Sequence, residues 1–105
     1  KEEAKIDWSK TAQEIERIIR AFDPWPGTWT TIDDKRMKIY PPTTIKNAGE
    51  INSKPGEIVK IDDRFGVMTG NGILILSSLQ LEGKKEMSSQ DFLRGYPDTV
   101  GKILD

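Results

Sequence analysis

Residues 69–81 read Thr-Gly-Asn-Gly-Ile-Leu-Ile-Leu-Ser-Ser-Leu-Gln-Leu, a glycine-containing turn followed by a long apolar run. The pair Asn71-Gly72 favours a tight hairpin, because both residue types tolerate the positive φ angles of such a turn. The four consecutive aliphatic residues 73–76 predict a strand that is buried on both faces or crosses the centre of a barrel. A single apolar strand of this kind needs neighbouring strands, so further strands are expected in the rest of the chain.

Period-two patterns precede this strand along the chain. Residues 28–32 are β-branched and aromatic, Asp33-Asp34 reads as a turn, and residues 36–40 alternate outward polar with inward apolar positions, which predicts a hairpin. Pro41-Pro42 predicts that this strand ends there or lies at a sheet edge. Residues 46–56 predict a long loop, and residues 57–61 and 65–69 predict two further short strands. Five or six strands at this spacing favour a small closed or partly open barrel.

Two helices are expected beside the strands. Apolar residues from Ala12 to Phe22 recur at helical spacing, and Thr11 with Glu14 forms a capping box, so a helix over residues 11–22 is predicted. Residues 23–27, Asp-Pro-Trp-Pro-Gly, end it because proline removes backbone donors and fixes φ. A second helix of one or two turns is predicted over residues 88–95, with Gly95 as its stop.

Composition excludes several kinds of function. The chain has 105 residues, which suits one domain with one core, and it contains neither histidine nor cysteine. Triads and thiolate or imidazole metal sites therefore lack their usual members, and no catalytic residue, cofactor or metal is predicted in this domain. No apolar run approaches the roughly 20 residues of a membrane helix, and residues 1–5 lack the apolar centre of a signal peptide. A cytoplasmic protein with no membrane partner is expected.

Charge is unevenly distributed along the chain. The net charge is −1, but residues 35–60 hold six basic and two acidic residues, so this segment alone carries +4. Phosphate binding normally requires a basic excess, so the whole chain does not predict a free-standing nucleic-acid binder. A local basic stripe would suit a domain that orients a substrate held mainly elsewhere. The competing interpretation is that these lysines are ordinary solvated surface, and composition alone favours it.

Several strings resemble the C-terminal domain of methionyl-tRNA formyltransferase, and they occur in order along nearly the whole chain. The strings are residues 6–8 (Ile-Asp-Trp), 18–27 (Ile-Ile-Arg-Ala-Phe-Asp-Pro-Trp-Pro-Gly), 55–58 (Pro-Gly-Glu-Ile), 69–72, 79–80, 83–87 (Gly-Lys-Lys-Glu-Met) and 92–95 (Phe-Leu-Arg-Gly). The resemblance implies a single formyltransferase C-terminal-type domain over residues 1–105. Its fold would be a mainly β barrel related to the OB-fold, with one N-terminal helix and a short C-terminal helix, and residues 1–10 would be the end of an interdomain linker. The start at Lys1, without Met, favours a fragment of a longer protein.

The resemblance also implies that catalysis and tRNA binding lie in different domains. An N-terminal formyltransferase domain of the same polypeptide would carry the catalysis with 10-formyltetrahydrofolate as co-substrate, while this domain would help to hold initiator Met-tRNA for translation initiation. The residues expected to contact tRNA phosphates are Lys84, Lys85, Arg36 and Lys38, and then Lys46, Lys54 and Arg94. The competing interpretation of Lys84 and Lys85 is a solvated turn that caps the barrel. Trp25 and Trp29 could stack on bases, but their apolar neighbours favour core packing.

Two alternatives keep the fold and change the role. The domain could shape the catalytic cleft of a formyltransferase that acts on nucleotide-linked amino sugars, or of a 10-formyltetrahydrofolate hydrolase or dehydrogenase, and the near-neutral charge suits this role. It could instead be an interaction module that uses Trp8, Phe22 or Trp25 as a hydrophobic dock for its N-terminal domain or for a protein partner.

Overall fold

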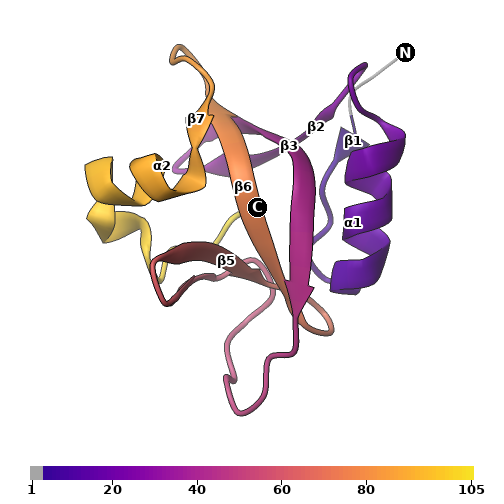
Figure 1. Cartoon of the computed structure of the whole chain (residues 1–105), viewed down its shortest axis with the longest axis vertical. Coiled ribbons are helices and arrows are strands. Elements are labelled where there is room, and N and C mark those ends of the chain that lie inside the picture. Colours follow the sequence, from indigo (N-terminus) through magenta and orange to yellow (C-terminus); the bar gives the residue numbers. More distant parts are fainter. Residues whose placement is uncertain (1–3) are drawn as a thin grey trace.

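A strongly bent sheet of seven strands carries two helices in the computed structural model, which describes residues Ala4–Asp105 (Figure 1). The strands are β1 (Ala4–Lys5), β2 (Thr28–Ile32), β3 (Lys35–Lys46), β4 (Ile58–Ile61), β5 (Arg64–Met68), β6 (Ile73–Leu81) and β7 (Met87–Ser88). The helices are α1 (Ala12–Ala21), α2 (Ser89–Gly95) and a short 3-10 turn, η1 (Pro97–Thr99). The mainly β fold with one N-terminal and one short C-terminal helix is therefore confirmed, as an open, barrel-like sheet.

The strand order is β1-β2-β3-β6-β5-β4, with β7 added to the end of β6. All pairs are antiparallel except β1 with β2, which is parallel. The strand β6 is the long central element, as the apolar run predicts. Its residues Leu74 and Leu76 lie in the main core, whereas Ile73 and Ile75 pack on the opposite face in a second apolar cluster, so this half of β6 is buried on both faces.

The prediction that the strand ends at Pro41-Pro42 is wrong, but the alternative that it lies at an edge is confirmed, because β2 pairs only with residues 35–39 of β3 and the described stretch from Tyr40 to Lys46 pairs with β6 alone. The strand β3 continues to Lys46 and pairs with β6 on both sides of the prolines. The register steps from Tyr40 opposite Ser78 to Thr43 opposite Leu76, so the two prolines oppose the single residue Ser77. A β-bulge of this kind leaves the extra residue out of the ladder, and proline can therefore occupy it without the loss of a paired N–H.

The helix α1 begins as its sequence predicts. The Thr11 hydroxyl accepts the N–H of Glu14 at 3.1 Å, and the Glu14 carboxylate accepts the N–H of Thr11 at 3.0 Å, which completes the capping box. The buried side chains Ala12, Ile15 and Ile19 join the main core, and α1 packs on β3. On the other side of the long β3–β6 pair, α2 packs on β5 and β6 through Phe92 and Leu93 (Figure 1).

Two turns differ from their predicted geometry. In the β5–β6 connection only Gly72 has a positive φ, of 92°, so Asn71 does not adopt the left-handed conformation of a two-residue hairpin turn. The reason is that Asn71 is held by the start of α1, where the N–H of Ala12 donates to the Asn71 carbonyl at 3.0 Å. Gly95 is the last residue of α2 and lacks a positive φ, so the helix ends at Tyr96 without a left-handed glycine.

Both ends of the described chain pack against the sheet. Of the stretch predicted as the end of a linker, residues 4–10 belong to the packed domain, since β1 pairs with β2 and the side chains of Ile6 and Trp8 are buried in the core. The C-terminal segment, residues 101–105, hydrogen-bonds to residues 56–58 beside β4 and then to Thr31 of β2. This C-terminal segment thus spans the open side of the sheet between two strands that do not pair with each other. Within residues 4–105, neither helix has the length and apolar character needed to cross a bilayer.

Candidate nucleic-acid interface

A row of side chains runs across four adjacent strands on the outer side of the sheet. The pairing register places Lys5 of β1 beside Trp29 of β2, Trp29 opposite Lys38 of β3, and Lys38 opposite Gln80 of β6. Residues directly opposite each other on paired strands share a face, and so do alternate residues of one strand. Arg36 and Tyr40 therefore lie on the same face as Lys38. We call this surface the cationic face; it comprises Lys5, Trp29, Arg36, Lys38, Tyr40 and Gln80.

Trp29 forms the centre of the cationic face. The guanidinium carbon of Arg36 lies 3.8 Å from the centroid of the Trp29 ring, and the Lys5 ammonium lies 5.4 Å from it. Cations at these distances are attracted to the ring quadrupole, by about 0.5–1 kcal/mol at exposed sites. The half-buried indole therefore holds two positive charges on the surface of the sheet, and Lys5 also forms an ion pair with the Asp105 carboxylate at 3.9 Å.

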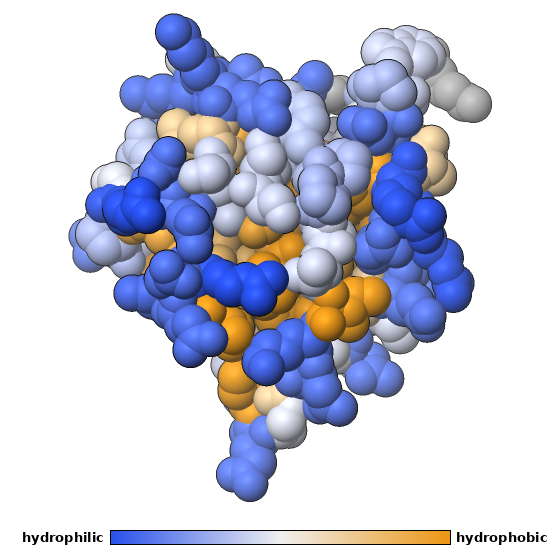
Figure 2. All heavy atoms as spheres, viewed as in Figure 1, coloured by the Kyte–Doolittle hydropathy of each residue, from blue (hydrophilic) through white to orange (hydrophobic). Residues whose placement is uncertain are grey.

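A chain of hydrogen bonds joins the cationic face to the turn between β6 and β7. The Tyr40 hydroxyl donates to the Gln80 side-chain oxygen at 2.6 Å, and the Gln80 amide donates to the Lys84 carbonyl at 2.9 Å. The N–H of Lys84 donates to the Leu81 carbonyl at 2.9 Å, which closes the turn. Lys84 and Lys85 are exposed on this hairpin, where hydrophilic side chains gather at the top of the view in Figure 2.

A shallow pocket of about 260 Å³ lies where the cationic face meets the hairpin; its lining residues are Arg36, Lys38, Gln80, Leu81 and Glu82. Glu82 and Glu86 bring negative charge to the same region. The Glu82 carboxylate accepts the backbone N–H of Arg36, and the Glu86 carboxylate accepts the Ser78 hydroxyl at 2.6 Å. Both carboxylates therefore accept hydrogen bonds from donors of the sheet.

Four of the residues predicted to contact tRNA come together in this way, namely Arg36, Lys38, Lys84 and Lys85, whereas the other candidates lie elsewhere. Lys46 is at the opposite end of β3 from Arg36, roughly 30 Å away at the usual rise per residue. Lys54 is exposed in the loop between β3 and β4. Arg94 lies on α2 and forms an ion pair with Asp91 at 2.5 Å.

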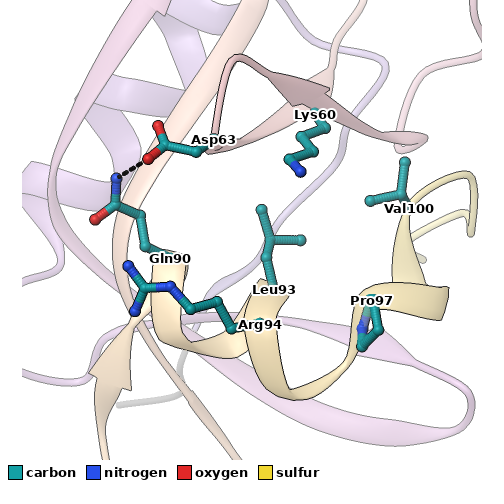
Figure 3. A pocket seen from close by; sticks show the side chains of 7 residues that line it. All are labelled: Lys60, Asp63, Gln90, Leu93, Arg94, Pro97 and Val100. Atoms are coloured by element: carbon teal, nitrogen blue, oxygen red, sulfur yellow. Dashed lines mark hydrogen bonds between the residues drawn. The ribbon is translucent and has the colours of Figure 1, made fainter.

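Arg94 also borders a separate pocket of about 240 Å³ between α2, η1 and the β4–β5 hairpin (Figure 3). Lys60 and Leu93 point into this pocket, and the Gln90 amide donates to the Asp63 carboxylate at 3.3 Å on its other side (Figure 3). The pocket draws on elements other than the strands of the cationic face. Arg94 therefore does not extend that face.

The three tryptophans have three different environments. Trp8 is 4% exposed, and its indole N–H donates to the Thr30 hydroxyl at 2.9 Å inside the core, so it cannot be the surface dock considered above. Trp29 is half-buried on the cationic face. Trp25 is 67% exposed, so the prediction that it packs in the core is wrong. Its turn projects from the end of α1, and the prolines on either side line a narrow cleft together with Lys38 and Tyr40 of β3.

Sequence reasoning missed Lys5, Tyr40 and Gln80 as members of this surface, and it considered Trp29 as a base-stacking ring but favoured core packing for it. For Trp29 the signal was present, because the alternation of residues 28–32 places Thr28, Thr30 and Ile32 inward and hence Trp29 outward. For Lys5 and Gln80 the decisive fact is strand pairing, which the sequence alone does not specify.

Acidic residues with altered proton affinity lie outside this surface. Hydrogen bonds from the Ser9 hydroxyl and N–H lower the pKa of Asp7, and those from the Thr11 N–H and hydroxyl lower the pKa of Glu14. Both carboxylates cap local backbone structure. Within the described part of the chain, no three acidic side chains come close enough to hold a metal ion.

Comparisons with known proteins agree with this architecture. The model of the family described as formyl transferase, C-terminal domain, matches residues 1–97. A methionyl-tRNA formyltransferase of Lachnospira eligens is 40% identical over 104 residues, which cover 95% of this chain and 33% of the relative. This chain therefore spans about a third of the length of that relative.

Solved structures of HypX from Aquifex aeolicus share the fold. The complex with tetrahydrofolic acid superposes with a TM-score of 0.71 at 19% identity, over 91% of this chain and 17% of that one. The A392F-I419F variant superposes with a TM-score of 0.63 at 20% identity, over 87% of this chain and 17% of that one.

Proposed function

This chain belongs to the formyl transferase C-terminal domain family, and from that membership we propose that it is the substrate-positioning part of a cytoplasmic methionyl-tRNA formyltransferase. In this proposal, an N-terminal domain of the same polypeptide transfers the formyl group from 10-formyltetrahydrofolate to initiator Met-tRNA. The present domain holds the tRNA by its phosphates. The 40% identity to an enzyme of that name supports the parent activity.

The observation that carries the positioning role is the cationic face. Lys5 of β1 and Arg36 and Lys38 of β3 flank Trp29 of β2, and the exposed Lys84 and Lys85 continue the positive charge onto the next hairpin. Ammonium and guanidinium groups on a rigid sheet position a phosphate backbone without reading its bases. Such contacts add orientation and modest affinity, which suits a domain whose net charge is only −1.

Titration of the 105-residue chain with initiator tRNA over a range of salt concentrations tests this role. Five phosphate contacts predict a slope of log affinity against log salt of about −3.5 to −4.5, because each contact releases condensed counterions. Replacement of Lys38 by Gln is expected to reduce the slope by about 1. Lys46→Gln is the matched control, since it removes the same charge at the far end of the same strand and is expected to leave the slope unchanged. An affinity without salt dependence would contradict phosphate contact.

The net charge of −1 favours one alternative, in which the domain shapes the cleft of a formyltransferase acting on nucleotide-linked amino sugars or of a 10-formyltetrahydrofolate hydrolase or dehydrogenase. The two functions differ in what the parent enzyme accepts. An assay of the full-length enzyme with Met-tRNA and with a sugar nucleotide separates them, because only the first function predicts formyl transfer to the methionine amine.

A further inference from the structure

Trp25 presents its indole to solvent from a constrained turn. The side chain is 67% exposed, in contrast to Trp8 at 4%, and within the described chain it has no ring or cation–π partner. Pro24 and Pro26 flank it, and the N–H of Gly27 donates to the Phe22 carbonyl at 2.8 Å, which closes the turn against the end of α1. Because the backbone is constrained on both sides of Trp25, the exposed indole projects from a fixed position on the domain surface.

The Trp25 turn adjoins the cationic face. Pro24 and Pro26 line a narrow cleft of about 20 Å³ together with Lys38 and Tyr40 of β3. The residues on either side of Trp25 therefore line a cleft with the strand whose side chains form the proposed phosphate-binding surface. An aromatic ring beside a row of cations is the arrangement by which proteins bind unpaired nucleotides, with phosphates on the cations and bases on the ring.

From this placement we infer that Trp25 stacks on an unpaired nucleobase whose neighbouring phosphates lie on the cationic face near Lys38. The inference rests on the proposed function and extends it, since it adds a base contact to a surface otherwise limited to phosphates. The neighbours of Trp25 favour a nucleobase over an apolar protein surface, because the adjacent β3 side chains are an ammonium and a phenol. A base carrying phosphate can belong to RNA or to a free nucleotide, and the experiment below distinguishes these sources.

Four forms of the 105-residue chain test the inference: the wild type, Trp25→Ala, Trp25→Leu and Trp25→Phe. Each is titrated with initiator tRNA, with a blunt RNA duplex that has no unpaired base, and with uridine monophosphate. Trp25→Ala is expected to bind tRNA about tenfold more weakly, within the roughly 5- to 150-fold range of a lost base stack. Trp25→Phe keeps an aromatic face and should retain most of the affinity, whereas Trp25→Leu keeps only apolar bulk and should resemble Trp25→Ala. Affinity for the duplex and the salt slope should be the same for all four.

The outcomes separate this inference from the proposed function. Wild-type binding to tRNA with the expected salt slope, but no loss in Trp25→Ala, overturns the stacking role and leaves the phosphate-binding role in place. Equal binding of Trp25→Leu and wild type also overturns it, because that result indicates apolar contact without stacking. If uridine monophosphate binds and depends on Trp25 while tRNA does not bind, the stacking stands, its source is a free nucleotide, and the tRNA-positioning function fails. If neither ligand binds, both proposals fail. Thermal unfolding of each variant is the folding control, and an exposed side chain predicts little change.

Discussion

Replacement of Gly70 by alanine should destabilise this domain more than its position in a surface turn would suggest. Gly70 lies between β5 and β6, and its N–H donates to the Lys10 carbonyl at 2.9 Å. A Cβ at Gly70 would lie 2.0 Å from the Ser9 carbonyl oxygen and 2.9 Å from the Ser9 carbonyl carbon. Both are backbone atoms, so neither can rotate away. The segment that leads from β1 into α1 must shift as a whole.

The cost follows from what that segment holds in place. A shift breaks the Gly70–Lys10 hydrogen bond and strains the adjacent bond from the Ala12 N–H to the Asn71 carbonyl, which together contribute about 2 kcal/mol. It also displaces the buried Trp8; full exposure of a large apolar side chain costs about 1.5–3 kcal/mol, so its partial exposure adds up to that amount. The expected loss in the free energy of unfolding is about 4 kcal/mol, against a total of roughly 5–15 kcal/mol for a domain of this size.

Urea denaturation followed by circular dichroism measures this loss. The matched control is Gly95→Ala, because Gly95 lies in α2 without a positive φ and a Cβ there meets no atom within 4 Å. That variant should be as stable as the wild type or more stable, by up to about 1 kcal/mol, since alanine favours a helix. A free energy of unfolding for Gly70→Ala within about 1 kcal/mol of the wild type would show that the N-terminal segment is not held as the structure indicates.

Three further predictions concern the helices and the hairpin. Hydrogen bonds from the Thr11 N–H and then from the Thr11 hydroxyl lower the pKa of Glu14, so the contribution of this carboxylate to stability is present above the ordinary pKa of 4.5 and is lost as the pH falls through the lowered value. The difference in melting temperature between wild type and Glu14→Gln should therefore be largest near neutral pH and vanish in acid. A difference that stays constant with pH would argue against the capping box. Phe92→Ala should lower the free energy of unfolding by about 3–5 kcal/mol, because the Phe92 ring is 1% exposed and packs on Phe65 with ring centroids 5.9 Å apart. Chemical denaturation measures this loss, and a loss below about 1 kcal/mol would mean that α2 does not pack in the core. The double variant Lys84→Gln/Lys85→Gln should reduce the salt slope of tRNA binding by about 2, and an unchanged slope would identify the two lysines as a solvated turn.

The elements that the sequence predicts well are those whose signal is local. The capping box at Thr11 and Glu14, the alternation of residues 36–40 and the aliphatic run 73–76 each concern neighbours along the chain, and the structure confirms the helix, the hairpin strand and the doubly buried strand. Proline at positions 41 and 42 also gives a local signal, but its effect depends on the partner strand. Because β6 supplies one residue opposite two, the ladder absorbs both prolines in a bulge.

The candidate site was less predictable because it depends on pairing and on exposure. Arg36 and Lys38 follow from alternation within one strand, but their neighbours Lys5 and Gln80 join them only through the register of β1 and β6. The strand β1 has two residues, too few for any periodicity. Trp25 has an apolar composition typical of a core residue, and only the direction of its turn places it in solvent. Residue type predicts what a side chain can bind, and the fold decides whether that side chain is exposed to a ligand.

The C-terminal segment also bears on how this domain behaves among many copies of itself. An open sheet has two edges whose unpaired N–H and C=O groups can recruit a strand from another molecule, which is a common route to aggregation. Here Leu104 and Lys102 bond to the backbone beside β4, while Asp105 exchanges both backbone hydrogen bonds with Thr31 of β2 at 2.9 and 3.0 Å. One short segment therefore occupies backbone groups at both sides of the opening. A concentrated solution of this protein should stay monodisperse as long as the C-terminal segment keeps these hydrogen bonds. Edge-to-edge association of sheets should begin when the segment detaches.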